Sequence, residues 1–129
     1  MTERTLTLRV LPGSLAVCRL APGEALPAWA TSGGFWSITR TLDELSVVCA
    51  AEAVPEGVRQ VGPWRALQVA GPLDFALTGI LSALATPLAA AGLSLFAIAT
   101  YDTDYLLVRA EALEAAVAAL RGAGHHVLP

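Results

Sequence analysis

Residues 64–127 carry the most regular pattern of the chain, and this pattern restricts the fold that the chain can adopt. Apolar residues from Leu77 to Leu88 recur at helical spacing, and Gly92 is placed to end this helix, although Pro87 is expected to kink or shorten it. Strands are predicted over residues 64–69, 93–99, 105–108 and 125–128, and a second helix over residues 112–121. The resulting order, βαββαβ, predicts a ferredoxin-like α+β fold in which an antiparallel sheet has its helices on one face.

The first half of the chain repeats part of this pattern with few helical signals. Residues 35–48 align without gaps with residues 95–108, and residues 7–11 align with residues 66–70. Strands are predicted over residues 6–11, 15–20, 35–40 and 45–49, the first two in hairpin contact, and one short helical turn over residues 26–30. We therefore predict two tandem units, a degenerate and helix-poor unit over residues 1–62 and a complete unit over residues 63–129.

Composition excludes several classes of partner. Hydrophobic residues make up 55% of the chain and charged residues 15%, so we expect a second subunit to cover part of the surface, in a homodimer. The eight basic residues are all arginine, the net charge is −3 and no basic run is present, which excludes nucleic acid. The uncharged stretch over residues 75–101 does not predict a membrane span, because Pro87 and Gly92 divide it into a helical and a strand-like part.

The N-terminal residues and the cysteines predict a cytoplasmic protein. The first residues lead into an alternating segment rather than into an apolar signal core, so no export signal is expected. Cys18 and Cys49 lie in apolar, strand-like runs, where we expect buried, reduced thiols rather than a disulfide or a metal site. His125 and His126 precede the last strand and are expected to form a surface pair without a metal or catalytic role.

The polar insert between the strands at residues 93–99 and 105–108 is the main candidate for a functional site. It contains, in order, Thr100, Tyr101, Asp102, Thr103 and Asp104. A turn with side-chain to backbone bonds explains such residues without a ligand. The spacing of the two carboxylates also suits a divalent cation, but no third carboxylate lies nearby, so no metal and no other cofactor is predicted. An acid–base role for the carboxylates would require a nucleophile, electrophile or cofactor site, and none is visible, so the chain is not predicted to be an enzyme.

Three segments, residues 35–41, 71–81 and 87–108, resemble the ACT domain group, in particular small, mostly bacterial ACT proteins related to the cytosolic arginine sensors of animals. The resemblance covers nearly the whole chain. It implies tandem ACT units, no catalysis, and an amino acid bound at an interface between units as a regulatory signal. Carried over by position, the ligand cleft would include Asp74, Leu77, Gly79, Thr100, Tyr101 and Asp104, with Ser94 and Leu95 contributed by the facing unit. Leu77 stands where the arginine sensors have a glutamate suited to a guanidinium, so the expected ligand has an apolar or neutral side chain rather than that of arginine.

The chemistry of these residues suits a free amino acid. The ligand ammonium requires an anion, which Asp102 or Asp104 supplies, and the ligand carboxylate requires N–H donors. Such donors are expected at the start of the predicted helix, from Leu77 through Thr78 to Gly79, because a helix N-terminus favours negative charge. Together these groups predict one hollow of the size of a zwitterion.

Three residues of the predicted cleft each suit more than one arrangement. Tyr101 or Phe75 is expected to wall the pocket, and Asp74 is as well suited to cap the helix as to contact a ligand. The predicted function is an amino-acid-binding regulatory or sensor module that acts through association or on an unidentified partner protein. The alternative is a non-catalytic assembly or interaction protein whose ACT cleft is vestigial.

Overall fold

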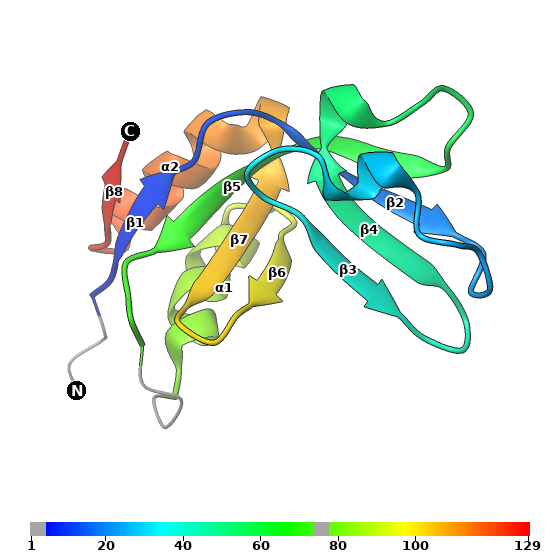
Figure 1. The fold of residues 1–129 in the computed structure, drawn as a ribbon. Helices are drawn as coiled ribbons and strands as arrows, with labels where there is room; N and C mark the ends of the chain where they lie inside the picture. Colours follow the sequence, from blue (N-terminus) through cyan, green and yellow to red (C-terminus); the bar gives the residue numbers. More distant parts are fainter. Residues whose placement is uncertain (1–4, 74–77) are drawn as a thin grey trace. The chain divides into compact units, whose positions relative to one another are not determined.

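The computed structural model describes residues 5–73 and 78–129, which divide into two compact units (Figure 1). We call Gly13–Trp64 the N-terminal unit and call the other, which joins the residues up to Pro12 with Arg65–Pro129, the C-terminal unit. The strands are β1 (Thr7–Val10), β2 (Leu15–Leu20), β3 (Ser37–Arg40), β4 (Leu45–Ala50), β5 (Gln60–Val69), β6 (Phe96–Ala99), β7 (Asp104–Arg109) and β8 (His126–Leu128). The helices are α1 (Ile80–Ala90) and α2 (Leu113–Gly122), with 3-10 turns η1 (Ala28–Thr31), η2 (Ala51–Ala53) and η3 (Ala110–Ala112). No helix within the described ranges is long and apolar enough to cross a membrane.

The sheet of the C-terminal unit has the strand order β8-β1-β5-β7-β6. β1 is antiparallel to β5 and parallel to β8, and the fully buried Leu8 lies opposite both Val69 and Val127. The predicted hairpin between residues 6–11 and 15–20 is therefore wrong, because the apolar face of β1 completes this sheet and β2 pairs elsewhere. The predicted boundary between residues 62 and 63 falls inside β5, close to the observed division after Trp64, but β1 belongs to the C-terminal unit.

Both helices cover one face of this sheet (Figure 1). α1 buries Ile80, Leu84 and Leu88, whose spacing of four residues places them on one side of the helix. Together with Ala116 and Leu120 of α2, they pack against apolar side chains from β1, β5, β7 and β8. This arrangement confirms the predicted α+β class, an antiparallel-rich sheet with helices on one face.

Glycines in the left-handed backbone region bound α1 at both ends. Gly79, the N-cap, has φ of +78°, and Gly92, just beyond the helix, has φ of +75°. The Gly92 N–H donates to the Ala89 carbonyl at 3.0 Å, and the Leu93 N–H donates to the Leu88 carbonyl at 2.9 Å. These bonds satisfy the last carbonyls of the helix, so the predicted stop at Gly92 is confirmed.

Pro87 lies within α1 and does not end it. Because proline has no N–H, the Ala83 carbonyl lacks the intrahelical donor that position 87 would normally provide. His125 supplies the missing donor: its Nε2 lies 3.0 Å from the Ala83 oxygen, while its Nδ1 accepts the Leu6 N–H at 3.1 Å. His125 is only 5% exposed, so the predicted surface pair is wrong for this residue and holds only for His126.

The N-terminal unit contains the antiparallel strands β3, β4 and β2 and the first residues of β5. Its β3–β4 hairpin has the same register as β6–β7, since Ser37 lies opposite Val48 and Phe96 opposite Leu107. A 3-10 turn follows the second strand in both cases. The internal repeat therefore exists in three dimensions, but its spacing is 59 residues, one fewer than in the gap-free sequence alignment. The register of the two hairpins, and not the matching of apolar residues in the sequence, determines which residues of the two units are equivalent.

Candidate functional site

The connection between β6 and β7, residues 100–103, is a tight turn held by Thr100. The Thr100 N–H and hydroxyl donate to the Thr103 carbonyl at 2.8 and 2.9 Å, and the Thr103 N–H donates to the Thr100 hydroxyl at 3.3 Å. In the β3–β4 connection, Thr41 makes the corresponding bonds to Glu44. Turn chemistry therefore accounts for Thr100 without a ligand.

Further contacts fix this 100–103 turn against the end of β5. Thr103 is 5% exposed, and its hydroxyl donates to the Val69 carbonyl at 2.7 Å. The Leu73 N–H donates to the Asp102 carbonyl at 2.6 Å. Gly71 passes so close that a Cβ built on it would lie 3.0 Å from the same Asp102 oxygen, so a residue without a side chain is required there. These contacts hold Asp102 and Thr103, the last two residues before β7, in place.

The Asp102 and Asp104 carboxylates are not needed by the turn. Among the described residues, neither carboxylate has a hydrogen-bond or ion-pair partner. Asp104 begins β7 and is half-buried, whereas Asp102 is exposed. In residues 5–73 and 78–129, no group of three or more His, Cys, Asp or Glu side chains is placed to hold a metal ion. Both carboxylates can therefore bind a cationic group that is not part of the described residues.

The start of α1 supplies the opposite polarity. Its N-cap is Gly79, which has no side chain to bond the first N–H groups of the helix. The first bond within the helix is from the Ala83 N–H to the Gly79 carbonyl, at 2.9 Å. The N–H groups of Ile80, Leu81 and Ser82 precede this bond and therefore have no acceptor within the helix. They carry the positive end of the helix dipole, which favours an anion.

The 100–103 turn and the start of α1 line one cleft of about 290 Å³. The described residues that line it are Leu73, Gly79, Ile80, Leu81, Ala99, Thr100, Tyr101, Asp102, Thr103 and Asp104, none of them basic. Leu81 and Tyr101 are 45% and 80% exposed, so two large apolar side chains border the cleft in contact with water. Its volume is near the lower end of ligand pockets, about 300 Å³, and suits a small polar molecule with an apolar part.

Five predicted ligand-binding residues line this cleft: Gly79, Thr100, Tyr101, Asp102 and Asp104. Thr78, Ser94 and Leu95 are described but do not line it, and Thr78 does not cap α1. Asp74, Phe75 and Leu77 lie outside the described residues. Sequence reasoning did not select Ile80 or Leu81, because an apolar residue in a helical pattern is read as core, and it did not select Leu73, which precedes the predicted helix. The exposure of Leu81, beside the buried Ile80, depends on where α1 begins.

Comparisons with known proteins agree with this fold. An ACT domain family model matches residues 61–122, and a second family model, of an N-terminal domain, matches residues 13–57. The chain is similar to the crystal structure of protein Atu0741 from Agobacterium tumefaciens, with 43% identity and a TM-score of 0.92 over 98% of this chain and 94% of that one. None of the curated proteins compared with the chain matches it.

Two more distant structures share the fold. Protein VC0802 from Vibrio cholerae, described as a protein of unknown function and possible transport protein, is 23% identical, with a TM-score of 0.76 over 92% of this chain and 90% of that one. The regulatory subunit of aspartate kinase from Thermus flavus is 14% identical, with a TM-score of 0.60 over 93% and 97% of the two chains. At these identities the likeness shows the fold alone. The predicted ACT domain is confirmed, and the narrower relation to arginine sensors stays a prediction.

Proposed function

Since this chain belongs to the same family as Atu0741 and contains an ACT domain over residues 61–122, we propose that it is a non-catalytic, cytoplasmic sensor that binds a free amino acid in the cleft beside the 100–103 turn. ACT domains are small-molecule-binding regulatory modules. The observation that supports an amino acid as the small molecule is the joint lining of one cleft by the start of α1 and by two carboxylates that have no partner among the described residues. A zwitterion has the two charges that these groups complement.

In this proposal each part of the ligand has its own partner. The Ile80 and Leu81 N–H groups receive the ligand carboxylate, because they have no acceptor within α1. Asp104 receives the ammonium. It is half-buried, so water screens its negative charge less than it screens the charge of the exposed Asp102. The exposed Leu81 and Tyr101 side chains contact the apolar or neutral side chain of the ligand.

The open cleft is the part of the proposal that requires a second copy of the chain. Pockets that hold small ligands bury most of the ligand surface, and this cleft leaves its apolar border in water. We propose a homodimer in which Ser94 and Leu95 of a facing unit close the site, as the family resemblance implies. By stabilising the dimer with the closed site, the ligand would then change the association of the two copies or their control of a separate regulated protein.

A thermal-shift screen of the twenty amino acids tests the proposal. A ligand that binds only the folded state raises stability by about 2.7 kcal/mol at a concentration of 100 times Kd. Asp104→Asn should then weaken binding of the active amino acid at least tenfold, by about 1.4 kcal/mol, through loss of a charge-assisted bond.

Asp43→Asn is the matched control for this screen. Asp43 lies in the equivalent turn of the N-terminal unit, and within the described residues its side chain has no bonded partner. This variant should bind as the wild type does. Absence of a shift with every amino acid would contradict the sensor proposal and favour the assembly protein with a vestigial cleft.

A further inference from the structure

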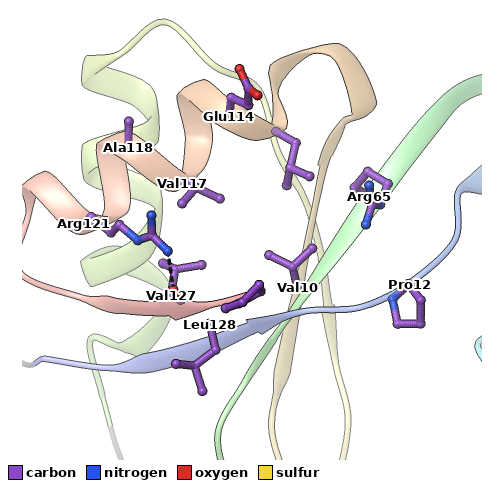
Figure 2. A pocket seen from close by; sticks show the side chains of 11 residues that line it. Val10, Pro12, Arg65, Glu114, Val117, Ala118, Arg121, Val127 and Leu128 are labelled. Carbon is purple, nitrogen blue, oxygen red and sulfur yellow. Dashed lines mark hydrogen bonds between the residues drawn. The ribbon is translucent and has the colours of Figure 1, made fainter.

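The C-terminal unit has a second and larger cavity, of about 770 Å³ (Figure 2). It lies between α2 and the strands β1, β5 and β8, and shares no lining residue with the cleft described above. The residues that line it are Val10, Pro12, Arg65, Leu113, Glu114, Val117, Ala118, Arg121, Val127, Leu128 and Pro129. A volume of this size is typical of pockets for small organic molecules, roughly 300–1,000 Å³.

The centre of the cavity is apolar. Figure 2 shows Val117 of α2, Val127 of β8 and Val10 of β1 between the two arginines of the lining. Val127 is 5% exposed, whereas Val10 and Val117 are half-buried although they belong to the edge of the main core. Apolar side chains that line a cavity rather than fill it favour a ligand with a hydrocarbon body.

Two guanidinium groups are held at this apolar surface. Arg65 donates from Nη2 to the Leu11 carbonyl at 3.1 Å, and Arg121 donates from Nη2 to the Val127 carbonyl at 2.6 Å. Each group uses only one of its five N–H donors in these bonds. Each arginine is therefore oriented by the backbone, and most of its donors are not used by other residues that the structure describes.

Neither cavity arginine is neutralised by a carboxylate of the described residues. In residues 5–73 and 78–129 the ion pair is between Arg109 and Glu111, 3.7 Å apart, and neither Arg65 nor Arg121 has a carboxylate within pairing distance. The Arg65 Nε is buried and has no hydrogen-bond partner among the described atoms. A half-buried guanidinium with unsatisfied donors is expected to bind an anion.

One acidic side chain also lines the cavity, but it does not cancel this charge. Glu114 is exposed in the first turn of α2, and Figure 2 shows its carboxylate directed away from Val117 and Val127. The cavity thus offers two cationic groups and an apolar wall.

We propose that this cavity binds an organic carboxylate with an apolar body, the head group on Arg65 and the hydrocarbon part along Val10, Val117 and Val127. Arg121 adds attraction from the opposite side of the cavity. A carboxylate suits the planar, bidentate geometry of a guanidinium better than a simple inorganic ion does. This cavity shares no lining residue with the proposed amino-acid cleft, so a test of one proposal does not decide the other.

Octanoate is the probe, and octanamide is its uncharged counterpart of the same shape. By isothermal titration calorimetry on the wild-type chain, octanoate should bind saturably and at least tenfold more tightly than octanamide. This comparison requires no variant and therefore does not depend on whether a substituted chain folds. Absence of saturable octanoate binding, or equal binding of the amide, would overturn the proposal.

Variants locate the binding. Arg65→Gln should weaken octanoate binding at least tenfold, and Val117→Asp should do the same by placing a negative charge on the apolar wall. Arg59→Gln, the same charge change at an exposed residue of the N-terminal unit, should leave binding unchanged. Asp104→Asn should also leave it unchanged. If NMR shifts caused by octanoate map to the 100–103 turn and not to α2 and β8, the assignment of this cavity is wrong.

Discussion

Replacement of His125 by leucine tests how the C-terminal unit tolerates a proline within α1. The His125 ring joins two backbone groups that are far apart in sequence: Nδ1 accepts the Leu6 N–H, and Nε2 faces the Ala83 carbonyl. Since Nδ1 is an acceptor, the proton of the neutral ring is on Nε2, which donates to Ala83. Leucine fills a similar volume but makes neither bond.

The cost follows from the two backbone groups that the substitution leaves without a partner. A buried group left unsatisfied costs about 1–3 kcal/mol, so two such groups give an upper range of about 2–6 kcal/mol. Leu6 is buried, but Ala83 is half-buried, and its carbonyl regains part of this loss by contact with water. We therefore expect the free energy of unfolding to fall by about 2–3 kcal/mol.

A double-mutant cycle with Pro87→Ala isolates the proposed cause. Alanine restores an N–H at position 87, which can donate to the Ala83 carbonyl within α1. In that background the cost of His125→Leu should be smaller by about 1 kcal/mol, because one of the two groups keeps a donor. The two substitutions should not be additive.

Urea denaturation of the four proteins measures these differences, with His126→Leu as the control. His126 is exposed, so its replacement should change the free energy of unfolding by less than about 0.5 kcal/mol. Nitrogen NMR of the wild-type imidazole should show the proton on Nε2. The reasoning is refuted if His125→Leu costs no more than the control, or if the cycle is additive.

Three further predictions concern the loop and the N-terminal core. Gly71→Ala should destabilise the protein by about 1–3 kcal/mol in urea denaturation, since the added Cβ would lie 3.1 Å from the Thr103 Cβ, whereas Gly23→Ala, with nothing within 4 Å, should be neutral. Thr103→Val should cost about 1–2 kcal/mol by removing the bond to Val69, and should also weaken amino-acid binding; unchanged stability would show that this bond does not hold the turn. Burial raises the pKa of the Cys18 thiol from 9.0 to about 11, so the unfolded thiol ionises first and the free energy of unfolding should fall as pH rises from about 9 through about 11. The Cys18→Ala variant should lack this part of the pH dependence, and a wild-type slope in that variant would contradict the assignment.

The elements of the C-terminal unit could be predicted from local sequence. Helical spacing identified α1, and Gly92 in the left-handed region marks its end because a side chain there would be strained. The polar residues from Thr100 to Asp104 identified the turn and the acidic side of the cleft. These features depend on neighbours along the chain, so their signals are present in short segments.

Contacts between distant segments could not be predicted in the same way. Nothing in residues 6–11 distinguishes pairing with β2 from pairing with β5 and β8, since an amphipathic strand satisfies its hydrogen bonds equally in either position. The sequence alignment of residues 35–48 with residues 95–108 differs by one residue from the structural match for a similar reason. Apolar residues match at several offsets, and only the register of the two hairpins selects one of them.

The sequence by itself therefore determined the order of helices and strands, the ACT resemblance and the acidic turn. Only the tertiary structure decided that β1 completes the C-terminal sheet, that His125 is buried against a carbonyl left free by Pro87, and that Arg65 and Arg121 share a cavity. The physical reason is that spacing along one element reports which side chains share its face, whereas the partner of that face is selected by packing and hydrogen bonding among segments far apart in the chain.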